Sequence, residues 1–209
     1  MARLLQLDAS AAVEGSTSRS LTAAFAAAFA AVPGNAVVRR DLHAEPVPHL
    51  PHPQLHWAAP LRSGSAPAAA GEALQEALIA ELLAADVLVV GYPLYNYSLP
   101  SSLKAWIDHV HVPGRTAPSA GSPLAGRPAV LVATRGGDYG PGAPNEGRDL
   151  ATPVLELVLG EEMGMDVSVV ACQWTLAGNG PDREERVRRG GLERAAALAA
   201  VRELGSRLR

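Results

Sequence analysis

Short apolar runs alternate with longer runs of helical periodicity along this chain, and this alternation constrains the fold more than any other feature. It is typical of α/β proteins, in which strands of a parallel sheet are joined by crossover helices. The third and fourth short runs, Val-Leu-Val-Val and Val-Leu-Val-Ala, are continuously apolar, as strands buried on both faces must be. We expect strands at Arg3–Asp8, Ala36–Asp41, Val87–Gly91, Ala129–Thr134 and Asp166–Ala171.

The crossover helices are predicted from apolar stripes. Between the first two strands, apolar residues recur at offsets 4, 7, 8 and 11 over Leu21–Val32, and Pro33-Gly34 ends that helix. Two loops are longer than usual, His43–Ala70 and His111–Arg127. No repeat or composition shift marks a second domain, so residues 1–209 are predicted to form one doubly wound domain. Further helices are expected at Gly71–Ala85, Ser101–His109, Thr152–Met163 and Asp182–Leu208, where Gly190-Gly191 could interrupt the last.

Composition excludes several classes of function. The 209 residues carry a formal charge of −3 without a single-sign block, so neither nucleic acid nor a membrane surface is an expected partner. No membrane or targeting segment is evident. The single cysteine, Cys172, rules out an intramolecular disulfide and favours a cytoplasmic location. The single lysine, Lys104, lies in no P-loop, and the G-x-S-x-G pattern of serine hydrolases is absent.

The histidines do not predict a metal site. Four of the six fall within residues 43–56, where four prolines force an extended chain and no acid or cysteine completes a ligand set. His109 and His111 flank the second long loop. They could touch a substrate, although solvated histidines at a helix end explain them as well.

The loop after the first strand is a candidate anion site, because ligands of open parallel sheets bind outside the carboxyl ends of the strands. Residues 10–18 are rich in small hydroxylated side chains and lead into the first helix. Free N–H groups, the helix dipole and the hydroxyls would together attract a phosphate. A plain Ser/Thr N-cap accounts for the same residues equally well. The dinucleotide fingerprint G-x-G-x-x-G is absent.

Two further loops follow the third and fourth strands. Tyr95, Asn96 and Tyr97 cluster after the third strand in a chain that is only 4% aromatic. Such residues can line a flat heterocycle and bond its edge, although ordinary loop packing is an alternative. After the fourth strand, Gly136 and Gly137 would let backbone N–H groups approach a ligand, or would simply form a tight turn. Three such loops at one sheet edge predict a ligand site there.

These segments resemble the flavodoxin-like, FMN-dependent NADH azoreductases, which also act as NAD(P)H:quinone reductases. The resemblance rests on Ser10 with residues 16–18, on 93–97 leading into 103–108, on 134–137, and on the strand and helix order. It implies a flavodoxin-like three-layer sandwich, a five-stranded parallel sheet with helices on both faces. FMN is implied to lie with its phosphate and ribityl end on Ser10, Ser16, Thr17 and Ser18, and its ring among Leu94, Tyr95, Asn96, Tyr97, Thr134, Arg135, Gly136 and Gly137.

The resemblance also implies a reaction. NADH or NADPH would pass hydride to the flavin, and a quinone or aromatic azo compound would then take its place in a ping-pong cycle, with no side chain as dedicated acid or base. A homodimer with active sites between subunits is implied, with Tyr139 and Ala117 on the substrate side. A specialised flavin reductase with a biosynthetic or nitroaromatic acceptor is one alternative. A flavodoxin-like FMN carrier is another, against which the lack of an acidic cluster argues.

The chain departs from that family's pattern in three places. Leu94 and Thr134 stand where Met and Ser are commoner. The loop 113–127 lacks the usual Phe and Tyr, which leaves the substrate and nicotinamide preference open. The third departure is Cys172-Gln173-Trp174, where an acidic residue followed by Gly is usual.

Overall fold

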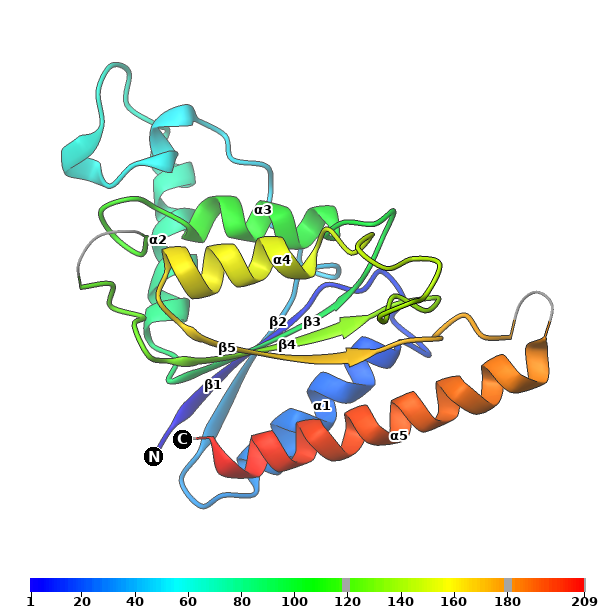
Figure 1. The fold of residues 1–209 in the computed structure, drawn as a ribbon. Coiled ribbons are helices and arrows are strands. Elements are labelled where there is room, and N and C mark those ends of the chain that lie inside the picture. Colours follow the sequence, from blue (N-terminus) through cyan, green and yellow to red (C-terminus); the bar gives the residue numbers. More distant parts are fainter. Residues whose placement is uncertain (118–120, 179–181, 209) are drawn as a thin grey trace.

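The computed structural model describes residues 1–117, 121–178 and 182–208, and within them the chain forms a parallel sheet of five strands in the order β2-β1-β3-β4-β5 (Figure 1). All neighbouring strands pair in parallel. The five predicted strands are confirmed, three of them one or two residues longer than expected. They are β1 (Arg3–Asp8), β2 (Ala36–Asp41), β3 (Val87–Pro93), β4 (Pro128–Thr134) and β5 (Asp166–Cys172).

Helices cover both faces of the sheet, which confirms the predicted three-layer arrangement (Figure 1). One face carries α1 (Thr17–Ala30) and α5 (Arg183–Arg207), and the other carries α2 (Ala69–Leu83), α3 (Ser101–Val110) and α4 (Thr152–Leu155). In the part of the chain that is described, no helix is long and apolar enough to cross a bilayer.

Alternating strand residues supply two cores. In β3, Leu88 and Val90 belong to the core beneath α2 and α3, whereas Val89 belongs to the core beneath α1 and α5. All three are fully buried, as is Phe25 of α1. Burying each such side chain contributes about 1.5–3 kcal/mol, so both faces of the central strands stabilise the sheet.

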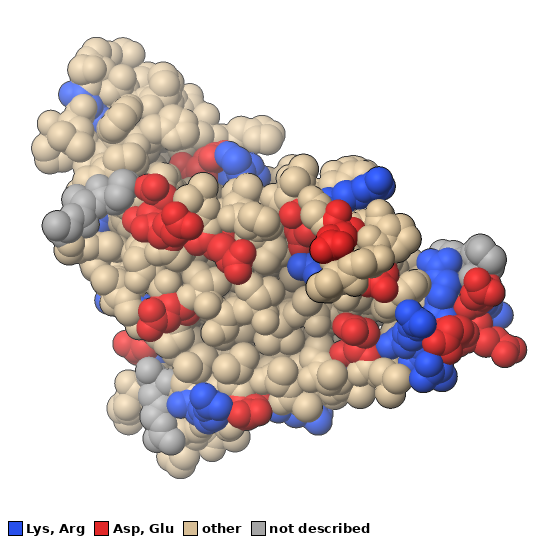
Figure 2. Space-filling model, in the orientation of Figure 1, with Lys and Arg blue, Asp and Glu red and all other residues tan. Residues whose placement is uncertain are grey.

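Three helix predictions need correction. The first helix begins at Thr17, not Leu21, because the Ser16 hydroxyl accepts the Arg19 N–H at 3.4 Å and caps it. The helix predicted at Thr152–Met163 is α-helical only to Leu155 and π-helical over Glu156–Glu162. Gly190-Gly191 does not interrupt α5, which runs unbroken. Acidic and basic side chains are intermixed at its amino end (Figure 2), where Glu185 pairs with Arg188 and Arg189.

The first long loop contains two short 3-10 helices, Pro53–His56 and Ala59–Leu61, and is fastened to α2 and α3. Gln75 of α2 donates to the carbonyl of Leu55 at 2.7 Å. The His109 ring donates from Nε2 to the carbonyl of Pro48 at 3.0 Å. His109 is fully buried, and burial lowers its pKa, so it is a structural tether and not the solvated or substrate-facing residue that was expected.

Candidate functional site

The loops that follow β1, β3 and β4 meet at the carboxyl edge of the sheet and enclose a cavity of about 230 Å³. The cavity lies where the strand order changes direction, between β1 and β3. Many residues expected at a ligand site are therefore brought together. The lining residues are Ser10, Ala12, Gly15, Ser16, Thr17, Pro93, Leu94, Tyr95, Thr134, Gly136, Thr175 and Leu176.

The amino end of α1 forms one side of this cavity. The N–H groups of Thr17 and Ser18 have no acceptor among the residues that the structure describes. No acidic residue lies in the first turn of α1. Ser10 is buried, and its hydroxyl oxygen accepts the Ala12 N–H at 3.3 Å, which leaves the hydroxyl proton available. The helix end thus offers N–H donors and hydroxyls to an anion, as a helix dipole favours.

The loop after β3 is a tight turn that holds Tyr95 in the cavity. Tyr95 and Ser98 exchange backbone hydrogen bonds at 3.1 and 2.9 Å around Asn96 and Tyr97. Both central residues have positive φ, 49° and 67°, which asparagine tolerates and tyrosine adopts only at a cost. The Tyr95 hydroxyl accepts the Ala11 N–H at 3.2 Å and so links this turn to the loop after β1. Asn96 and Tyr97 themselves are exposed and do not line the cavity.

The loop after β4 uses its carbonyls to bind the loop after β5 and keeps N–H groups that bond nothing in the described part of the chain. The carbonyls of residues 135–137 accept the N–H groups of residues 174–176, at 3.1 to 3.2 Å. The N–H groups of Gly136 and Gly137 have no acceptor in the described part of the chain. A Cβ at Gly136 would lie 2.8 Å from Cδ1 of Leu176, so a side chain there would displace that exposed leucine from the cavity wall. Free N–H groups in such a turn suit an electron-rich ligand edge.

Arg135 turns away from the cavity and anchors this loop. Its guanidinium pairs with Asp149 at 2.6 Å and lies over the Tyr139 ring at 5.9 Å. Asp149 also accepts from the N–H and hydroxyl of Thr152, at 3.0 and 2.7 Å. Burial acts to raise the pKa of Asp149, but these bonds and the Arg135 charge outweigh it, so the pKa is lowered. Arg135 therefore positions the backbone N–H groups and is not a lining residue.

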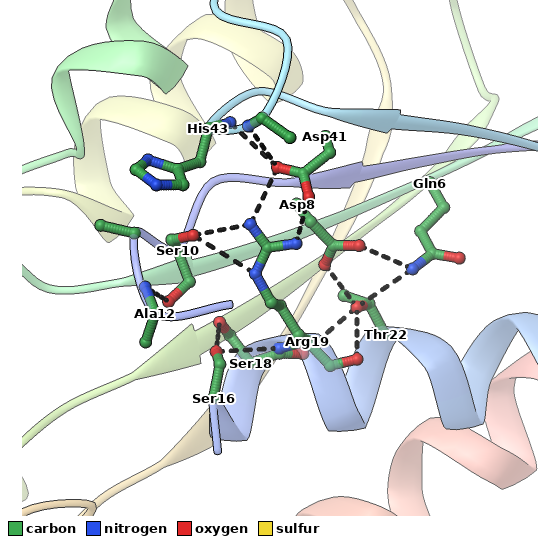
Figure 3. A network of polar contacts seen from close by, with 12 residues as sticks. Gln6, Asp8, Ser10, Ala12, Ser16, Ser18, Arg19, Thr22, Asp41 and His43 are labelled. Carbon is green, nitrogen blue, oxygen red and sulfur yellow. Dashed lines mark hydrogen bonds and ion pairs between the residues drawn. The ribbon is translucent and has the colours of Figure 1, made fainter. Parts of the chain in front are cut away.

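A polar network lies beneath the loop after β1 (Figure 3). Thr22 donates to the carboxylate of Asp8 at 2.6 Å, and Gln6 donates to it at 2.8 Å. Burial raises the pKa of Asp8, and these two bonds offset only part of that rise. On the other side of the network, Arg19 pairs with Asp41, and this bond holds the pKa of Asp41 to about 2.

The remaining predicted residues fall at different distances from the cavity. Ser18 is buried behind the α1 end, and its hydroxyl contacts that of Ser16 at 3.2 Å. Tyr139 lies beside Arg135 at the same edge of the sheet. Ala117 is not brought to this site, because α3 returns the chain to the opposite edge, where Ala117 is 2% exposed in the core.

Sequence reasoning missed the contribution of the loop after β5. Thr175 and Leu176 line the cavity, and their N–H groups occupy carbonyls of the β4 loop. The available signal was position, since β5 pairs with β4 and these residues follow its end. A second cavity of about 280 Å³ shares Thr17 and Thr175 with the first and extends to Arg194 on α5.

Comparison with known proteins identifies the family. The sequence matches the family described as having a flavodoxin-like fold over residues 2–198. The chain belongs to that family. A Kineococcus radiotolerans relative named FMN-dependent NADH:quinone oxidoreductase is 50% identical to this flavodoxin-like protein over 210 residues, covering 100% of both chains. A Frankia alni relative of the same name is 43% identical, covering 96% of this chain and all of that one.

Solved structures agree with the fold. An azoreductase from Bacillus anthracis superposes with a TM-score of 0.81 at 22% identity, with 100% of each chain covered. An FMN-dependent NADH-azoreductase from Bacillus anthracis, solved in complex with FMN, gives a TM-score of 0.77 at 19% identity and 98% coverage of each chain. The resemblance to azoreductases and quinone reductases stated from the sequence is confirmed.

Proposed function

We propose that this flavodoxin-like protein is an FMN-dependent NADH:quinone oxidoreductase that works by a ping-pong cycle and also reduces aromatic azo compounds. One observation carries the proposal: Gly136 and Thr17 line the same cavity, and the backbone N–H groups of both have no acceptor in the described part of the chain. An anionic phosphate and an electron-rich ring edge on one molecule would satisfy both sets. The names of the relatives from Kineococcus radiotolerans and Frankia alni support this choice of ligand.

The residues present fit FMN. Ser10, Ser16 and Thr17, with Ser18 behind them, would hold the phosphate and ribityl end at the amino end of α1. Leu94, Tyr95, Thr134 and the 136–137 backbone would hold the ring, while Asn96, Tyr97 and Arg135 shape their loops. When bound, FMN accepts hydride from NADH and passes electrons to the acceptor. N–H groups at the ring edge would stabilise negative charge that develops there, as donors in an oxyanion hole do.

We further propose that two copies of the chain complete the site. A cavity of about 230 Å³ is smaller than the roughly 300–1,000 Å³ typical of small-molecule sites. Tyr97, two residues after the cavity-lining Tyr95, is 48% exposed, and Leu150 is 58% exposed. The Tyr97 carbonyl accepts the Leu150 N–H at 3.0 Å, so the two lie side by side. A second subunit over this surface would deepen the site and cover both residues.

The single-domain assignment of residues 1–209 is part of this proposal, supported by two cores that share one sheet. Tyr139 stays on the proposed substrate side, whereas the buried Ala117 does not. The cytoplasmic location stays a prediction.

The first test is the visible absorption spectrum of the purified protein with FMN, before and after anaerobic addition of NADH. Bound-flavin bands that bleach on addition are the expected result. A protein that takes up no FMN would contradict the proposal. Retained bands that NADH fails to bleach would favour the FMN carrier instead.

Steady-state rates then separate the acceptors. Quinone and azo acceptors should both be turned over, with parallel double-reciprocal plots at varied NADH, as a ping-pong cycle requires. Rapid NADH bleaching without turnover of quinone, nitroaromatic or azo compounds would favour the specialised reductase.

A further inference from the structure

Arg19 joins three segments that lie far apart in the sequence (Figure 3). It is the third residue of α1, and its guanidinium bonds both carboxylate oxygens of Asp41 at the end of β2, at 2.5 and 2.8 Å. The same guanidinium donates from Nε and Nη2 to the carbonyl of Ser10, at 3.3 and 2.7 Å. The end of β2, the loop after β1 and the start of α1 are thus held by one planar group.

Arg19 does not itself face the cavity. It is absent from the lining, whereas Ser10, Ser16 and Thr17 are present. Its guanidinium is already occupied by four contacts, two with Ser10 and two with Asp41. Any effect of Arg19 on a ligand must therefore pass through the residues that it holds.

The held residues are those that offer donors to an anion. Ser10 supplies a hydroxyl whose direction depends on the backbone that Arg19 grips. The backbone N–H of Arg19, which any residue but proline would supply, donates to the Ser16 hydroxyl at 3.4 Å, so the guanidinium itself holds Ser10. The planar guanidinium of arginine can hold two acceptors at once in a fixed geometry, which the ammonium group of a flexible lysine side chain cannot do.

We propose that Arg19, tethered by Asp41, is a positioning residue that sets the affinity of this site for the phosphate of FMN. The inference rests on the proposed function, and it concerns how the residues at the amino end of α1 are held in place to bind the phosphate. The phosphate-free analogue riboflavin would share the ring contacts but not this effect.

The decisive variant is Asp41→Ala. If Arg19 acted only as a positive charge, removing a nearby carboxylate would make FMN bind more tightly. If Arg19 acts by positioning, losing its tether should weaken FMN binding about 10-fold, while riboflavin binding changes less than about 3-fold. Dissociation constants for both flavins can be measured by quenching of flavin fluorescence on the purified chain.

Glu81→Ala is the matched control. Glu81 bonds Arg40 of β2 through two contacts, at 2.6 and 3.2 Å, and removing it changes the charge by the same amount. Glu81 lies on α2 and does not line the cavity. In the Glu81→Ala variant, the ratio of the riboflavin dissociation constant to the FMN dissociation constant should equal that of the unaltered protein. An equal weakening of FMN binding in Glu81→Ala would overturn the inference.

Arg19→Lys is the second variant. It allows the same two dissociation constants to be measured if Asp41→Ala fails to fold. Lysine retains the positive charge but lacks the planar guanidinium, so FMN should bind at least about 5-fold more weakly than to the unaltered protein. FMN binding in Arg19→Lys that matches the unaltered protein would overturn the positioning role. So would FMN binding in Asp41→Ala that is unchanged or tighter, or that weakens only as much as riboflavin binding does. Failure of the unaltered protein to bind FMN would instead overturn the proposed function.

Discussion

Replacing Gly91 by alanine is expected to disturb the contact between β3 and α1, because the two elements touch at this glycine. A Cβ at position 91 would lie 2.6 Å from Cγ2 of Thr22 and 3.1 Å from a carboxylate oxygen of Asp8. Both neighbours are buried, and a β-branched side chain has little freedom to move away. Overpacking of this kind costs about 1–3 kcal/mol, more than the gain of about 0.4–1 kcal/mol from a less flexible unfolded chain.

Thr22→Ser provides the compensating change. It removes Cγ2 but keeps the hydroxyl that donates to Asp8 at 2.6 Å. Alone it should cost about 0.8 kcal/mol, the value of one buried methyl group. In the double variant the missing methyl leaves room for the new Cβ, so the double loss should fall below the sum of the single losses by about 1 kcal/mol.

Urea unfolding followed by far-UV circular dichroism gives the free energies, provided that the denaturant slope is unchanged. Gly191→Ala is the control, because a Cβ there meets nothing within 4 Å, and it should stabilise α5 by about 0.5–1 kcal/mol. Losses for Gly91→Ala and Thr22→Ser that add within about 0.5 kcal/mol would refute the proposed contact.

Three further predictions concern packing and charge. Gly190→Ala should cost about 1–3 kcal/mol in the same urea assay, because its Cβ would lie 2.9 Å from a backbone oxygen of the β5–α5 loop. The buried His109 has a pKa below 6.5 and so favours its neutral form; the free energy of unfolding should fall as the pH drops below 6.5. His109→Gln should flatten that fall between about pH 7 and pH 5, and an unchanged slope would contradict the argument. Asp149→Ala leaves the guanidinium of Arg135 unpaired where the two side chains are 14% and 11% exposed, so it should cost about 3–5 kcal/mol. A loss below about 1 kcal/mol on urea unfolding would show that water replaces the pair.

The central strands were predictable because a strand that is buried on both faces needs a continuous run of apolar residues. Val89 and its neighbours in β3 must be apolar whichever core they face, so their run is continuous. The π-helical segment Glu156–Glu162 has no comparable sequence pattern. There the Met163 N–H donates to the carbonyl of Val158, five residues back in the chain. This hydrogen-bond pattern does not follow from the helix propensities of the residues.

The site was predictable as far as it follows strand ends. Ser10 and Gly136 follow β1 and β4, and topology alone brings them to one edge. The placement of Ala117 failed because the position of a long loop depends on where the preceding helix ends. The role of the β5 loop was hidden for another reason: it acts through backbone N–H groups, which every residue but proline possesses.

That backbone role explains how a large side chain, Trp174, can occupy a position of left-handed backbone in this loop. Trp174 has a φ of 59°, a left-handed conformation that costs a residue with a side chain about 1–2 kcal/mol. The guanidinium groups of Arg186 and Arg189 lie 5.5 and 5.9 Å from its ring, and each such contact contributes about 0.5–1 kcal/mol at an exposed site. Stacking therefore offsets the strain, while the Trp174 N–H still donates to Gly137 at 3.2 Å.

Two substitutions at this position separate stacking from strain. Trp174→Gly loses both, so urea unfolding should show little change in stability. Trp174→Ala loses the stacking and keeps the strain, so it should be less stable than the glycine variant by about 1 kcal/mol. Equal stability of the two variants would contradict the strain argument. FMN affinity should stay within about 3-fold of the unaltered value in both, because the donated N–H remains in place. Side-chain identity at the end of β5 is then free to vary while the N–H groups of the β4 loop keep their direction.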